Sequence, residues 1–210
     1  MKSEEKTKNF WSDSFVARLY RKHARRHFAE MHELLAKAIL VNNSKQVLDI
    51  ACGPGDFLEY LKDRDKSIKI TGTDIAPGMV AYAKDKLGEK ADIFETDSET
   101  LPFKDGLFDV VTVMMAFHHF PRQLDSLKEI KRVLKSGGIC FIADVMASSE
   151  FQKKLWNFFE KLSGVRGYTQ HYTEVDLSRL SEKASYSNFT CEHVPGMAKR
   201  YKVCRLIKGN

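Results

Sequence analysis

Short apolar runs alternate with segments of helical periodicity through the centre of the chain. The apolar runs, bounded by turn-forming residues, predict buried strands over 46–51, 67–74, 91–97, 107–117 and 139–145. Between them, apolar positions recur at helical spacing and predict helices over 56–65, 77–88 and 122–138. Pro77 lies near the start of the second helix and Gly88 follows its end, while Gly137 and Gly138 are expected to close the third helix.

The two ends of the chain show other patterns. Residues 1–42 carry apolar positions at helical spacing, with basic residues between them, and are predicted to form a helical cap. After the alternating centre, the pattern predicts two helices and then two strands, over 149–164, 173–184, 188–196 and 200–208. Thr173 is the expected N-cap of the second of these helices. The last two strands are expected to pair as a hairpin at the sheet edge.

Together these elements predict an α/β fold. Strands that alternate with helices imply a mostly parallel sheet covered on both faces, and the final hairpin adds an antiparallel pairing. The expected architecture is therefore a Rossmann-like, doubly wound sheet of seven strands. A length of 210 residues suits a single domain. We expect it to comprise the helical cap over 1–42, a ligand-binding core over 45–145, and substrate-side helices with the hairpin over 146–210.

The composition is that of an ordinary globular protein, with 43% apolar and 30% charged residues. No apolar run approaches the ~20 residues needed to span a bilayer, and the first residues lack a secretory signal, so we expect a cytoplasmic protein. The cysteines show no metal-ligand spacing, and we expect no metal site and no disulfide framework. Buried thiols are the preferred interpretation of Cys52, Cys140, Cys191 and Cys204.

The first predicted strand leads into a glycine-containing loop, CGPGD. Gly53 and Gly55 allow a ligand to approach the backbone closely, and the next helix directs free N–H groups toward this loop. A dinucleotide site would have a third glycine where this chain has Phe57 or Leu58. Asp56 also places a negative charge where a pyrophosphate would bind. The loop therefore favours a cationic nucleoside over NAD or FAD.

Two further acids end the next predicted strands. Asp74 follows Gly53 at about the ~20-residue spacing of a ribose-binding acid, although it is also placed to cap the following helix. Asp97 ends the third strand, where a carboxylate can accept a hydrogen bond from an exocyclic amine such as adenine N6. Alternatively, Asp97 forms an Asx-turn before Ser98. Strand, glycine loop and acid agree best with a ribose at Asp74.

These motifs, taken in order, resemble those of the class I S-adenosylmethionine-dependent methyltransferases, in particular the group that includes the enzymes of ubiquinone and menaquinone biosynthesis. The first motif is formed by Asp49, Ala51, Gly53 and Gly55, with alanine at the first glycine position. It is followed by the segments GTDIAPGM, TDSETLPFKDGLFDVV, MMAFHHF and LKEIKRVLKSGGICFIAD. The resemblance covers residues 45–145 and is weak at both ends of the chain.

The resemblance implies that the chain binds S-adenosyl-L-methionine and transfers its methyl group to a small-molecule acceptor. It implies cofactor contacts from Asp49, Ala51, Gly53, Gly55, Asp74, Ile75, Met79, Asp97, Ser98 and Met114. Met114 is equally well interpreted as a core side chain. The acids suit this cofactor, which carries a sulfonium and an amino group and no phosphate.

The acceptor side is less specific. His118 and His119 are candidate general bases, although a place in the pocket wall is the preferred interpretation. The candidate substrate-pocket residues are Trp11, Tyr20, His119 and Trp156, which would suit an apolar or aromatic acceptor, but aromatics at helical spacing are also typical of a core.

Two alternatives stay open, and the sequence does not define the acceptor, the methylated atom or the oligomeric state. The net charge is +6, with Lys and Arg in excess over residues 1–40 and 196–210. These basic ends are consistent either with solvated surface or with an RNA methyltransferase that contacts phosphates. A chain that binds S-adenosylmethionine without catalysing methyl transfer is the other alternative.

Overall fold

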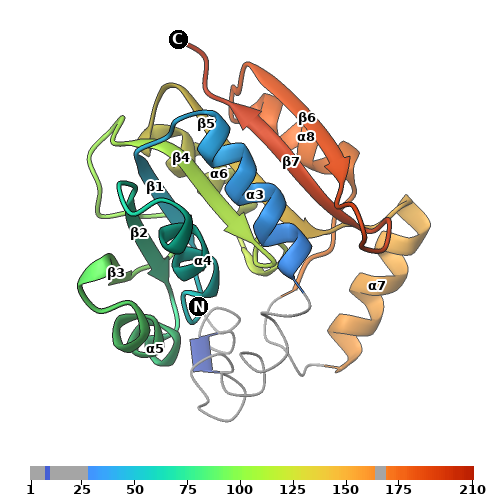
Figure 1. Ribbon diagram of the computed structural model, residues 1–210. Helices are drawn as coiled ribbons and strands as arrows, with labels where there is room; N and C mark the ends of the chain where they lie inside the picture. The colour runs from blue at the N-terminus through green and yellow to red at the C-terminus, as the bar shows by residue number, and fades with distance from the viewer. Residues whose placement is uncertain (1–7, 10–27, 164–168) are drawn as a thin grey trace.

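The computed structural model describes residues 8–9, 28–163 and 169–210. Seven strands form one sheet in the order β3-β2-β1-β4-β5-β7-β6 (Figure 1). Their bounds are β1 Gln46–Ile50, β2 Lys69–Asp74, β3 Ala91–Glu95, β4 Phe108–Met114, β5 Leu134–Val145, β6 Asn188–His193 and β7 Tyr201–Ile207. The first five strands are parallel, whereas β7 runs antiparallel to both β5 and β6. The predicted doubly wound sheet with an antiparallel C-terminal hairpin is confirmed.

Helices cover both faces of this sheet. The described helices are α3 Ala29–Val41, α4 Asp56–Arg64, α5 Pro77–Leu87, α6 Gln123–Val133, α7 Glu150–Ser163 and α8 Glu174–Lys183. All of them except α7 contribute side chains to the cores beside the sheet. Side chains of α3, α4 and α5 pack into one apolar core, and those of α6 and α8 pack into a second. Consecutive strand residues such as Val47 and Leu48 point into opposite cores, because side chains alternate across a strand. The chain is therefore a three-layer sandwich.

Local sequence signals explain where several helices begin and end. Pro77 is the first residue of α5, and Gly88 follows the helix with a φ of +52°. The Thr173 side chain accepts a hydrogen bond from the backbone N–H of Asp176, whose carboxylate accepts one from the N–H of Thr173 in return. This capping box confirms Thr173 as the N-cap of α8.

The predicted end of α6 is wrong. The helix stops at Val133 instead of continuing to Gly138, and the next residue, Leu134, is already extended and fully buried. β5 pairs with β4 through Leu134 and again from Ile139 onward, so the intervening residues form a bulge in the strand. Gly137, with a φ of +72°, serves that bulge and does not terminate the helix. A glycine pair is a common helix stop, which is why the sequence pattern misplaced the boundary.

The N-terminal cap is described only in part. The described residues of the predicted segment 1–42 form helical backbone at Lys8–Asn9 and the helix α3, whose Leu35 and Ile39 are fully buried against the sheet. The candidate pocket residues Trp11 and Tyr20 lie outside the described residues. No helix of the described ranges has the length and apolarity that a bilayer span would need.

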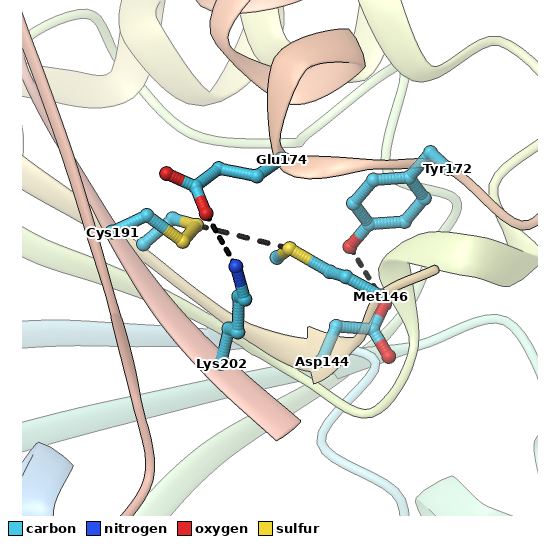
Figure 2. The surroundings of a disulfide bond; sticks show 7 residues. Asp144, Met146, Tyr172, Glu174, Cys191 and Lys202 are labelled. Atoms are coloured by element: carbon cyan, nitrogen blue, oxygen red, sulfur yellow. Dashed lines mark hydrogen bonds and ion pairs between the residues drawn. A yellow bond between two sulfur atoms is a disulfide. The ribbon is translucent and has the colours of Figure 1, made fainter. Parts of the chain in front are cut away.

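Two of the four cysteines form a disulfide, contrary to the prediction of free thiols. The hairpin register places Cys191 of β6 directly opposite Cys204 of β7, with their Cα atoms 4.0 Å apart, and the two sulfurs are bonded (Figure 2). The sequence could not show this pairing because it did not define the register of the hairpin. Cys52 and Cys140 are buried free thiols, as predicted.

Candidate functional site

A cavity opens at the carboxyl ends of the neighbouring strands β3, β2, β1 and β4. The chain order reverses between β1 and β4, and ligands of doubly wound folds bind at such a switch point. Most of the predicted cofactor residues line this cavity, namely Ala51, Gly53, Asp74, Ile75, Met79, Asp97, Ser98 and Met114. Of the remaining two, Asp49 lines a smaller cavity beside it, and Gly55 lines neither.

The loop after β1 uses its two glycines for different purposes. A Cβ atom at Gly53 would meet no atom within 4 Å, so its backbone faces open space in the cavity. A Cβ atom at Gly55 would lie 2.8 Å from Leu87 Cδ1, so this glycine allows the loop to pack against α5. Ala51 also has a positive φ, of +55°, although it carries a side chain. The backbone at Ala51 therefore adopts a conformation that glycine adopts without strain.

Asp74 binds the loop and faces the cavity at the same time. Its Oδ2 atom accepts a hydrogen bond from the Gly53 N–H at 2.9 Å, and its Oδ1 atom accepts one from the Ala76 N–H at 2.9 Å. Burial raises the pKa of Asp74 to about 6, although these backbone donors oppose the rise. Asp74 is not the cap of the following helix, because the N-cap of α5 is Ala76 and no side chain caps it. The carboxylate instead binds the segment before α5 and lines the cavity.

Asp97 and Ser98 also combine a local role with a place in the cavity wall. Asp97 Oδ1 accepts hydrogen bonds from the N–H groups of Glu99 and Thr100, at 2.8 and 2.9 Å, which is the Asx-turn that the sequence allowed. The Ser98 and Ser126 hydroxyls lie 2.8 Å apart. These contacts fix the segment after β3, so that Asp97 and Ser98 form part of the cavity wall.

Asp49 gives the smaller cavity an acidic wall. It is almost fully buried within β1, and its Oδ1 atom accepts a hydrogen bond from the Thr112 hydroxyl at 2.6 Å. Burial raises the pKa of Asp49 to about 7, against the effect of the Thr112 hydrogen bond and helped by the nearby charge of Asp74. Asp56 lines the same cavity but pairs with Lys86 of α5. Asp49 is therefore the less compensated carboxylate.

The two candidate histidines have different surroundings. His119 lines the main cavity, and its Nδ1 atom lies 3.2 Å from the Thr169 hydroxyl. His118 is not part of the cavity wall; it is buried, and its Nδ1 atom lies 2.7 Å from Asp144 Oδ1. Asp144 Oδ2 accepts a hydrogen bond from the His118 backbone N–H at 3.0 Å. It accepts another from the Tyr172 hydroxyl, also at 3.0 Å (Figure 2).

Asp144 is a buried carboxylate surrounded by donors. Burial alone would raise the pKa of Asp144, but the charge and hydrogen bonds of His118, with the Val145 N–H, outweigh it and lower this pKa. Tyr172, whose hydroxyl donates to Asp144, has a raised pKa because it is buried beside that charge. The cluster fixes the turn after β4 to the end of β5.

Trp156 lies one layer further from the cavity than predicted. Its ring meets the His171 ring edge to face, with centroids 5.0 Å apart, and His171 in turn stacks on His118. Trp156 is absent from the walls of both described cavities. Burial, with the charge of His118, lowers the pKa of His171. The rings of His171 and His118 therefore lie between Trp156 and His119 in the cavity wall.

Known proteins are similar to this chain in sequence and in fold. A family model described as a methyltransferase domain matches residues 48–142. The chain is 40% identical over 97 residues to the demethylmenaquinone methyltransferase of Thermus thermophilus, covering 45% of this chain and 44% of that protein. It is 26% identical over 161 residues to a sterol 4-C-methyltransferase of Caenorhabditis elegans, covering 73% of this chain and 48% of that protein. Residues 48–142 therefore form a methyltransferase domain.

A solved structure agrees with this assignment. The crystal structure of a SAM-dependent methyltransferase from Thermotoga maritima superposes with a TM-score of 0.72 at 22% identity, over 96% of this chain and 99% of that one, and it shares the fold. The predicted family, fold and cofactor class are thus confirmed. The chain spans about half the length of the curated relatives that it matches.

The cavity of the methyltransferase domain fits S-adenosylmethionine in charge and in hydrogen-bonding capacity. Asp74 and Asp97 line it, with Glu99, which pairs with Arg122. No Lys or Arg belongs to its wall within the described residues, which suits a cationic ligand. Each Asp74 oxygen accepts one backbone N–H and retains a lone pair for a second donor. The open side of Gly53 lets a ligand approach the backbone.

Several residues of the cavity wall were not predicted from the sequence. The cavity wall also includes Thr96, Glu99, Met115, Phe120 and Pro121. All of them follow β3 or β4, so the rule that ligands meet the carboxyl ends of strands could have found them. The same rule applies to Asp144 at the end of β5. Its contact with His118, 26 positions earlier, depends on tertiary packing that no local pattern reveals.

Proposed function

We propose that the chain transfers a methyl group from S-adenosylmethionine to a small apolar or aromatic acceptor. One cavity carries the proposal, because it has acids that suit the nucleoside at the ends of β2 and β3 and apolar residues with His119 after β4. When bound, the cofactor supplies a methyl group on a sulfonium, which is a good leaving group. The protein then has to position the reactants and exclude water.

The cofactor end of the cavity has defined roles in this proposal. Asp74 accepts hydrogen bonds from the ribose hydroxyls with the lone pairs that the loop leaves available. Asp97 accepts one from the adenine amine. Gly53 brings its backbone against the methionine part, and Asp49, in the adjoining smaller cavity, attracts its amino group. Support comes from the match of residues 48–142 to the methyltransferase domain model.

The acceptor end is apolar apart from one polar side chain. Met115, Ala116, Phe120 and Pro121 form its wall, and His119 lies among them. A pocket with few polar groups orients a ligand through those groups, so the acceptor has one polar atom that contacts His119. The relatives named for demethylmenaquinone and for a sterol act on apolar ring compounds, which supports this acceptor class.

His118 supports His119 from behind the wall. Its ring and its backbone N–H are both bound to Asp144, which also accepts the Tyr172 hydroxyl. His118 is therefore a positioning residue that fixes the turn carrying His119.

We expect His119→Ala to lower kcat for methyl transfer about 100-fold if His119 takes the acceptor proton, since general bases contribute at least that factor. Cofactor affinity, measured by calorimetry, should not change.

Titration calorimetry and turnover together test the proposed function. The chain should bind S-adenosylmethionine and S-adenosylhomocysteine, and it should release S-adenosylhomocysteine when offered a panel of quinols, phenols and sterols. Asp92→Asn, at an exposed position on β3, is a control that should bind like the wild type. The proposal would be refuted if the chain bound neither S-adenosylmethionine nor S-adenosylhomocysteine. Binding without turnover on any apolar ring compound would refute the acceptor class.

A further inference from the structure

Helix α7 presents its apolar face to the outside of the molecule. Phe151 is 75% exposed, Phe158 61% and Leu162 73%, and Leu155 and Phe159 are exposed beside them. These five residues, here called the α7 apolar face, recur at spacings of three and four, so they lie on one side of the helix. Soluble monomers rarely expose a contiguous apolar patch of this kind unless it binds something.

The polar side of α7 holds the helix to the rest of the protein. Lys153 pairs with Asp176 at 2.7 Å, and the Asn157 side chain both donates to the His171 carbonyl oxygen at 3.1 Å and accepts from the His171 N–H at 2.6 Å. Glu160 Oε1 lies 3.8 Å from His171 Nε2. Amphipathic helices usually bury the apolar side. Here specific polar contacts fix the opposite orientation.

Basic side chains border the α7 apolar face. Lys154 and Lys161 are exposed on one flank of it. The turn between β6 and β7 lies beside the start of α7 (Figure 1). It carries exposed Lys199 and Arg200, and the Arg200 carbonyl oxygen accepts a hydrogen bond from the N–H of Met146, before α7 begins. Glu150, the acid at the start of the helix, pairs with Lys153. The surface is therefore apolar with a cationic rim.

We propose that the α7 apolar face and its basic rim dock on an anionic lipid bilayer. A helix with large apolar side chains on one face and lysines at the border lies in the plane of the interface, with its apolar side in the headgroup region. Lys154 and Lys161 then reach the lipid phosphates with their flexible side chains. A second copy of this chain fits less well, because a symmetric contact through α7 would bring the like charges of its lysines together.

Vesicle sedimentation with the full chain tests this surface separately from methyl transfer. The chain should bind vesicles of phosphatidylcholine with a quarter phosphatidylglycerol more tightly than pure phosphatidylcholine, and added salt should weaken that binding. The double variant Phe158→Ser with Leu162→Ser should bind at least about tenfold more weakly. Lys154→Gln with Lys161→Gln should lose roughly 30-fold on anionic vesicles, because each basic residue near such a surface contributes about a factor of five.

Matched controls separate docking from folding. Val41→Ser removes an apolar side chain that is 77% exposed at the end of α3, and vesicle binding should be unchanged. Circular dichroism and thermal unfolding should be the same for all variants, since the changed side chains are exposed. Failure of the wild type to bind anionic vesicles would refute the proposal. Vesicle binding that stays unchanged in the α7 variants would also refute it. So would light scattering that shows a dimer of the wild type which the α7 variants, but not the control, dissociate.

Discussion

At the scale of single residues, Asp74 connects the cofactor loop to the start of α5. Replacing it with alanine should weaken S-adenosylhomocysteine binding about 100-fold, because charge-assisted hydrogen bonds to two ribose hydroxyls are lost. The fold should persist, since a carboxylate whose pKa is raised by burial is itself costly to bury when charged. Titration calorimetry measures the affinity and circular dichroism the fold. An unchanged affinity would show that Asp74 does not contact the ribose.

His118 should matter for stability more than for binding. His118→Ala removes the ring that contacts the fully buried Asp144 at 2.7 Å, and leaving a buried carboxyl group without such a hydrogen-bond partner costs about 1–3 kcal/mol. Denaturant unfolding at pH 7 should show this loss, and His193→Ala, at an exposed position on β6, should not. If the two variants unfold at the same denaturant concentration, the His118–Asp144 pair does not stabilise the turn.

The residues predicted best are those whose role follows from the ends of strands. Asp74 and Asp97 terminate β2 and β3, so their place at one edge of the sheet follows from topology once the strands are known. Trp156 was predicted from its aromatic character, which does not specify direction. It contacts His171 instead of the cavity because Asn157 binds the His171 backbone and sets the rotation of α7.

At the scale of elements, the disulfide joins the edge strand β6 to β7. It closes a loop between cysteines that are 13 positions apart, and a loop of that size corresponds to about 3 kcal/mol of stabilisation. Reduction with dithiothreitol should lower the free energy of unfolding by up to that amount, measured by denaturant titration. Cys204→Ala should unfold at the same midpoint with and without reductant. A wild type that is insensitive to reductant would contradict the stabilising role.

Helix boundaries were predicted correctly where residues at both ends marked them. They were predicted wrongly where a glycine pair could either end a helix or form a bulge in a strand. α5 was located to within a residue by Pro77 and Gly88. The end of α6 was misplaced because Gly137 and Gly138 serve a strand bulge that exists only opposite β4. The pairing of Cys191 with Cys204 required the register of the hairpin, which also depends on partners distant in sequence.

At the scale of the whole molecule, the alternation of strands and helices sufficed to predict the mostly parallel sheet and its cover of helices on both faces. The direction in which α7 faces was not predictable from its own sequence. The sequence predicted a helix on the substrate side with Trp156 in the pocket, whereas Trp156 lines neither described cavity and the neighbouring Phe158 and Phe159 are exposed. Polar contacts with Asp176 and His171 determine the orientation, and those partners belong to a later segment of the chain.

The pH dependence of the free energy of unfolding should show how much the burial of the ionised Asp49 and Asp74 carboxylates destabilises the fold. Asp49 and Asp74 are buried with pKa values raised to about 7 and about 6. A carboxyl group with a raised folded-state pKa holds its proton more tightly in the folded state, so it contributes stability at low pH that is lost as the pH rises through that pKa. Between about pH 4, near the unfolded-state pKa of Asp, and pH 7, the two acids together should cost the ligand-free chain roughly 5 kcal/mol.

Denaturant unfolding from pH 4 to pH 7.5 measures this loss, and the double variant Asp49→Asn with Asp74→Asn should flatten it. Asp92→Asn, at its exposed position, should keep the wild-type profile. S-adenosylmethionine, as a cation, should favour the ionised carboxylates. Its affinity for the wild type should therefore rise over the same interval, and that rise should be absent from the double variant. A decline in stability that survives both substitutions would place its cause outside these two acids.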